Sequence, residues 1–195
     1  MKLAIAMLGL ALPASVFAVD GVTLINQSTV MAAGGFPYKI TQPGSYKLSG
    51  NLDASQVMVD AIQITVSNVT LDLNGFSIFG PPSQNLGAGS GVNIFNNVNF
   101  VIVRNGTISG FLYQVYQALT AAPGGGLFED LVLTNGDFAH ASFGTSSVVR
   151  HVILPGATSQ ISVTCPTVVT ESVAAFIVRN INTTCALAAN VGAVI

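Results

Sequence analysis

Short apolar runs rich in Val, Ile, Thr and Phe alternate with polar turns along most of the chain after residue 20. Their period is close to two residues, which predicts β-strands whose successive side chains point to opposite faces. The clearest runs are 61–65, 68–78, 91–95, 99–109 and 160–164. The spacing of an amphipathic helix is missing almost everywhere in this part of the chain, so the pattern predicts an all-β fold.

Three segments share a phrase that ends in Asn-Gly: NVTLDLNGFSI at 68–78, NFVIVRNGTIS at 99–109 and EDLVLTNGDFA at 129–139. The Asn-Gly pairs recur after 31 and then 30 residues. An antiparallel sandwich with Asn-Gly hairpins is the alternative. A sandwich has no reason to repeat one phrase in near register, whereas a solenoid stacks the same positions of successive coils.

The Asn of each phrase suits a sharp bend between strands, because Asn tolerates the left-handed backbone conformation and the following Gly permits it freely. A fainter echo of the phrase occurs at 174–180. We therefore expect Asn74, Asn105, Asn135 and Asn180 to stack as one structural ladder of hydrogen-bonded side chains.

The phrases VTLDLNGFSI and FVIVRNGTISGF resemble those of parallel β-helix proteins of the pectin-lyase-like superfamily. The stretch 25–52 resembles the lead-in of secreted bacterial β-helix proteins of unassigned function. The resemblance implies a right-handed parallel β-helix, here of about five coils. Enzymes of the superfamily act on acidic polysaccharides with clustered Asp residues, but paired Asp, Gly-His-Gly and Gln-Asp are absent from this sequence. No catalytic residue is carried over, which favours a non-catalytic protein.

The two ends of the chain differ from the repeat. Residues 1–18 hold one basic residue, an apolar run and small residues before Val19, which predicts a secretory signal peptide and export to the periplasm, cell surface or medium. The alternative is a membrane anchor. It is less favoured, because a membrane-spanning helix needs about 20 apolar residues and this apolar run is shorter. Residues 19–55, with short strands near 38–40 and 46–48, are expected to form an N-terminal β cap, and residues 56–195 the β-helix. The uncharged C-terminal stretch ALAANVGAVI predicts an end without a cap, which either is covered by a partner, such as a second copy of the chain, or belongs to a longer helix.

Charged residues make up only 7% of the chain, against about 25% in an ordinary soluble domain. Without Lys2, five basic residues face eight acidic ones, which is too weak a field to favour nucleic acid. A neutral surface of hydroxyl and amide groups suits a glycan or another cell-envelope partner. A secreted non-catalytic scaffold that binds such a partner is therefore the favoured function. A polysaccharide-active enzyme with other catalytic groups and a structural module of a larger surface assembly are the alternatives.

Two insertions, 80–90 and 112–126, are expected to project as loops from one edge of the solenoid, where binding residues often lie. The second contains Tyr113 and Tyr116, and Phe111 directly precedes it. These rings predict a platform that stacks on sugar faces. The alternative is that Phe111 and one tyrosine pack on the coil below.

Two further sets of residues bear on metals and cross-links. Glu129, Asp130 and Asp137 share one coil and could hold calcium through oxygen ligands, but they lack the dense loop of a dedicated site, so no metal or other cofactor is expected. Cys165 and Cys185 lie twenty residues apart, close to one short coil. This spacing predicts a disulfide between neighbouring coils in an oxidising compartment, with two buried thiols as the alternative.

Overall fold

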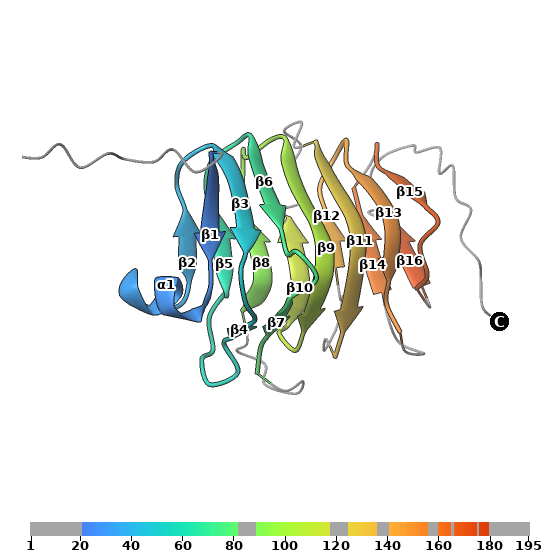
Figure 1. The fold of residues 1–195 in the computed structure, drawn as a ribbon. Helices are drawn as coiled ribbons and strands as arrows, with labels where there is room; N and C mark the ends of the chain where they lie inside the picture. Colours follow the sequence, from blue (N-terminus) through green and yellow to red (C-terminus); the bar gives the residue numbers. More distant parts are fainter. Residues whose placement is uncertain are drawn as a thin grey trace, which may run out of the picture.

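The computed structural model consists mostly of β-strands, which form two parallel sheets around one hydrophobic core (Figure 1). The structure describes residues 21–81, 89–117, 125–135, 141–155, 160–164, 166–174 and 176–179. The predicted signal peptide, Asn180, Asp137, Cys165 and Cys185 lie outside these residues.

The first sheet follows the order β1 (Val22–Ile25), β3 (Gly44–Leu48), β6 (Val69–Asp72), β9 (Val101–Ser109), β11 (Gly126–Thr134), β13 (Val148–Ile153) and β15 (Val168–Thr170), and the short strands β4 (Leu52–Asp53) and β7 (Ser77–Phe79) extend it through the β7–β9 pairing. The second follows the order β2 (Tyr38–Ile40), β5 (Ile62–Ile64), β8 (Ser90–Ile94), β10 (Tyr113–Gln117), β12 (Ala141–Phe143), β14 (Gln160–Val163) and β16 (Phe176–Arg179). Sheet order therefore follows chain order in both, and the chain crosses repeatedly from one sheet to the other.

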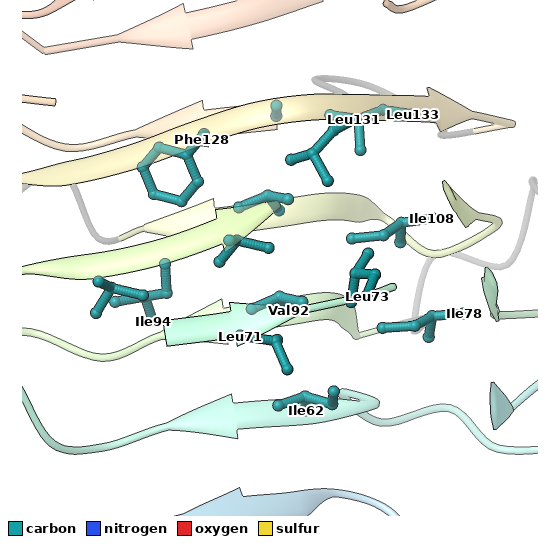
Figure 2. Close-up of a cluster of buried hydrophobic side chains, with 14 of the residues drawn as sticks. Ile62, Leu71, Leu73, Ile78, Val92, Ile94, Ile108, Phe128, Leu131 and Leu133 are labelled. Carbon is teal, nitrogen blue, oxygen red and sulfur yellow. The ribbon is translucent and has the colours of Figure 1, made fainter. Parts of the chain in front are cut away.

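Parallel pairing aligns equivalent apolar side chains in rows that face the core. In the first sheet, Leu71, Val103, Phe128 and Val149 are register partners, and all four are fully buried. Figure 2 shows labelled side chains of both sheets directed into the shared interior. The two-residue period of the sequence thus corresponds to one face packed in this core.

Most strands lie where the apolar runs predict them, which confirms the all-β class, but two segments differ. The N-terminal part contains β2 and β3 as predicted and also a short helix, α1 (Gln27–Ala32). Asn26 starts this helix with a capping box: its side chain accepts a hydrogen bond from the Thr29 amide at 3.0 Å, and Thr29 Oγ1 accepts one from the Asn26 amide at 2.8 Å. The expected loop 112–126 contains strand β10, which pairs with β8 and β12 inside the second sheet.

The register of the first sheet departs from the predicted asparagine ladder at Asn135. Val103 pairs with Phe128, an offset of 25 residues, which places Asp130 rather than Asn135 against Asn105. Asn135 instead follows the end of β11, and its amide nitrogen donates to Ser109 Oγ at 3.1 Å.

One corner of the first sheet is a row of left-handed residues with different side chains. Its members, with their φ angles, are Asn74 (54°), Asn105 (65°), Asp130 (53°), His151 (50°) and Glu171 (48°). The amide nitrogen of Asn74 donates to the Leu48 carbonyl at 3.1 Å, and that of Asn105 donates to Asp72 Oδ1 at 3.2 Å. Each of these two asparagines therefore reaches back to the preceding strand of the sheet.

Asn105→Ala is expected to lower the free energy of unfolding by about 1–3 kcal/mol, since it removes one hydrogen bond and places alanine in a left-handed conformation. Chemical denaturation of both proteins measures the change. Asn97→Ala is the matched control, because Asn97 is exposed and has nearly the same φ of 64°. An Asn105 variant no less stable than the Asn97 variant would show that the Asp72 contact contributes nothing.

Candidate functional site

Phe111 lies in the core and does not belong to an exposed aromatic platform. Its side chain has no solvent exposure. A Cβ atom added at Gly80 would lie 2.5 Å from the Phe111 ring, and one at Gly91 would lie 3.3 Å from it, so these two glycines make room for the ring. The prediction that Phe111 contacts a ligand is therefore corrected: the residue is a packing element beneath strand β10.

Tyr113 and Tyr116 lie together on the outer face of the second sheet. Both side chains are half-buried, their ring centroids are 5.1 Å apart, and the ring planes meet at 47°. Gln114 and Val115, between them, are both buried, which explains how two tyrosines three residues apart reach the same face. The structure therefore brings these two predicted residues together, on a strand of the sheet instead of a projecting loop.

A pocket of about 230 Å³ lies beside the two rings. It is lined by Gly89, Ser90, Asn93, Leu112, Tyr113 and Tyr116. Strand pairing positions this lining, because Tyr113 is the register partner of Ser90 and Tyr116 that of Asn93. Two aromatic rings next to a few fixed polar groups form a surface suited to a small polar ligand with apolar faces.

The Asp60 carboxylate organises the polar side of this pocket. Its Oδ1 accepts a hydrogen bond from the Ser90 amide at 2.7 Å, and its Oδ2 accepts bonds from Gln63 Nε2 and Asn93 Nδ2, each at 2.8 Å. Gly89 permits this close approach, since a Cβ there would lie 2.3 Å from the Asp60 backbone nitrogen. Sequence reasoning missed Asp60, Gln63 and Asn93, because the contacts join residues up to 33 positions apart.

Comparison with known proteins identifies no relative: the chain matches no family model, no curated protein and no solved structure. The function is therefore argued from the geometry of the chain itself.

A row of alternating charges crosses the outer face of the first sheet. Its members, as successive register partners, are Lys47, Asp72, Arg104, Glu129 and Arg150. Arg104 Nη2 lies 3.3 Å from Asp72 Oδ2, and Arg150 Nε donates to Glu129 Oε2 at 2.7 Å. Opposite charges on directly facing positions stabilise neighbouring strands, so this row has a structural explanation within the sheet.

Of the residues suggested for calcium, Asp137 lies outside the described residues, and Glu129 and Asp130 each contact a basic side chain on the neighbouring strand. Glu129 pairs with Arg150, and Asp130 Oδ1 lies 3.2 Å from His151 Nδ1. The other ring nitrogen of His151 lies 2.6 Å from Glu171 Oε2, so the two ring nitrogens serve different carboxylates. Within the described ranges, no group of three or more His, Cys, Asp and Glu side chains is arranged to hold a metal ion. The same residues contain no helix of the length and apolarity that would cross a membrane.

Proposed function

We propose that the chain is a right-handed parallel β-helix of the kind found in the pectin-lyase-like superfamily. Support comes from the two parallel sheets, in which strand order follows chain order. It also comes from the crossing of the chain between the sheets in each repeat, since a solenoid buries its core by stacking similar units. The repeated phrases at 68–78 and 99–109 supply β6 and β9, which are neighbours in the first sheet.

Within that architecture, the protein is an exported, non-catalytic scaffold that binds a surface glycan of the cell envelope. The observation that supports this role is the pocket at Tyr113 and Tyr116, where two adjoining rings meet a fixed polar network. Aromatic rings offer flat apolar area at small entropic cost, which suits the apolar face of a sugar ring. On the first sheet, the carboxylates of Asp72 and Glu129 are held in ion pairs with arginines. Carboxylates engaged in this way are poor candidates for catalysis, which favours a binding role.

Tyr113→Ala and Tyr116→Ala are expected to weaken glycan binding by about 2- to 10-fold each, the size of one aromatic stacking contact. A glycan array identifies the bound sugars, and titration of the strongest of them gives the affinities. Phe100→Ala is the matched control, because Phe100 is an exposed aromatic residue in the segment before β9, outside the pocket.

Binding that falls in both tyrosine variants and persists in the Phe100 variant would support the glycan role. Absence of binding to every glycan, or unchanged binding in both tyrosine variants, would overturn it. Thermal unfolding of all four proteins separates loss of the contact from loss of the fold.

A further inference from the structure

We propose that the pocket beside Tyr113 and Tyr116 takes a neutral sugar through its hydroxyl groups and rejects uronic acids, and that Asp60 determines this preference. The inference rests on the proposed glycan-binding function and specifies the class of sugar. It follows from the direction in which the polar groups of the pocket are held.

The Asp60 carboxylate fixes the orientation of two side-chain amides. An ionised carboxylate only accepts hydrogen bonds, so Gln63 and Asn93 must present their nitrogens to it. Both do so at 2.8 Å. The oxygen of each amide is therefore turned away from Asp60. Asn93 lines the pocket, and its side-chain oxygen, which faces away from Asp60, can accept a hydrogen bond.

Asp60 is itself held in place from the backbone. The Ser90 amide donates to Oδ1 at 2.7 Å, and Ser90 is buried. Rotation of the carboxylate would leave this backbone donor without its partner, at a cost in free energy. The acceptor face is thus pre-formed before a ligand arrives, which reduces the ordering that binding requires.

An acceptor face selects a ligand that donates. Sugar hydroxyls donate hydrogen bonds, whereas an ionised uronic acid group only accepts them and carries the same sign of charge as Asp60. Lys39, Gln63 and Asn93 are register partners on the neighbouring strands β2, β5 and β8. Lys39 is therefore two strands, about 10 Å, from Asn93, and it lines a different pocket. Beside the rings, Asn93 and Asp60 therefore supply an amide oxygen that accepts and one carboxylate, while the Ser90 and tyrosine hydroxyls can donate or accept.

The test uses methyl glycosides of glucose, galactose and mannose, each paired with its uronic acid, titrated into the full chain and followed by amide chemical shifts. The wild type is expected to bind at least one neutral glycoside about 3- to 10-fold more tightly than its acid partner, the size of one or two hydrogen bonds. Shifts are expected at Tyr113, Tyr116 and Asn93.

Asp60→Asn is expected to remove or invert this preference. The new amide retains an oxygen for the Ser90 donor and offers its nitrogen to Gln63 and Asn93, whose amides must then turn their own nitrogens outward. Asp53→Asn controls for the change in net charge, because Asp53 is an exposed carboxylate on β4 whose pKa is held below its usual value by hydrogen bonds from Ser55. That variant is expected to keep the wild-type selectivity.

A uronic acid bound as tightly as its neutral partner by the wild type, or selectivity unchanged in Asp60→Asn, would overturn this inference while leaving the glycan role in place. No binding of any of the six probes, with no binding on the array, would overturn the glycan role itself. The measured quantity is the ratio of the affinities for the two sugars of a pair. Loss of folding weakens the binding of both sugars and therefore leaves this ratio unchanged.

Discussion

Phe111→Ala is expected to lower the free energy of unfolding by about 3–5 kcal/mol, the usual cost of deleting a buried aromatic ring. The ring is fully buried against Gly80 and Gly91, whose missing side chains leave a space that alanine cannot fill. For a chain of this length the loss corresponds to a fall in melting temperature of roughly 10 °C. Denaturant titration and thermal unfolding measure both quantities.

Phe100→Ala is an unusually close control for this change. Phe100 also has a left-handed backbone, with φ of 55° against 70° for Phe111, but it is 70% exposed. Backbone strain after substitution is therefore similar in the two variants, and only the burial of the ring differs. We expect the Phe100 variant to change stability by less than about 1 kcal/mol. Equal losses in both would mean that Phe111 is not the packing residue described above.

Gly106→Ala is expected to destabilise the protein by about 3 kcal/mol, through overpacking. An added Cβ would lie 2.5 Å from the Leu73 Cβ and 2.6 Å from the Phe76 carbonyl oxygen. Because one of these neighbours is backbone, the clash can be relieved only by moving β9 away from the turn at 73–76, between β6 and β7. Denaturant midpoints of the variant and the wild type test this.

Gly75→Ala, in the preceding Asn-Gly pair, separates two reasons for a glycine. Gly75 has φ of 77° and open space around its α-carbon, so alanine there meets only backbone strain. The expected loss is about 1–2 kcal/mol. A Gly75 variant that is less stable than the Gly106 variant would contradict the steric explanation for Gly106.

Strand positions could be predicted from the sequence where apolar and polar residues alternate regularly, as in β6 and β9. The register could not, because the Asn-Gly phrase occurs at two different corners of the first sheet. Asn105 lies within β9 at the first corner, whereas Asn135 follows the end of β11 at another. Both asparagines are left-handed, so the residue type alone does not distinguish the corners. Only the backbone pairing of β9 with β11 settles which positions face each other.

The candidate site could be predicted only in part, for a related reason. Two nearby tyrosines predict a candidate binding surface, but the strand that contains them is not predicted, because buried Gln114 and Val115 interrupt its alternation. Gln114 is accommodated inside through bonds from its amide nitrogen to the Gly110 and Thr134 carbonyls, at 2.7 and 3.0 Å. A buried amide nitrogen that donates to a carbonyl twenty positions away has no signature in a local pattern of hydrophobicity.

The alternating charges of the first sheet bear on how such a chain could lengthen by duplication. The strands β3, β6, β9, β11 and β13 contribute one member each, and neighbouring members carry opposite signs. Copying the single unit that contains Glu129 would place two carboxylates on directly facing positions, which destabilises the pair of strands. Copying the two units that contain Arg104 and Glu129 would preserve the alternation throughout. Duplication of an even number of repeat units therefore preserves the alternation of charges. Duplication of an odd number would need a compensating change of charge.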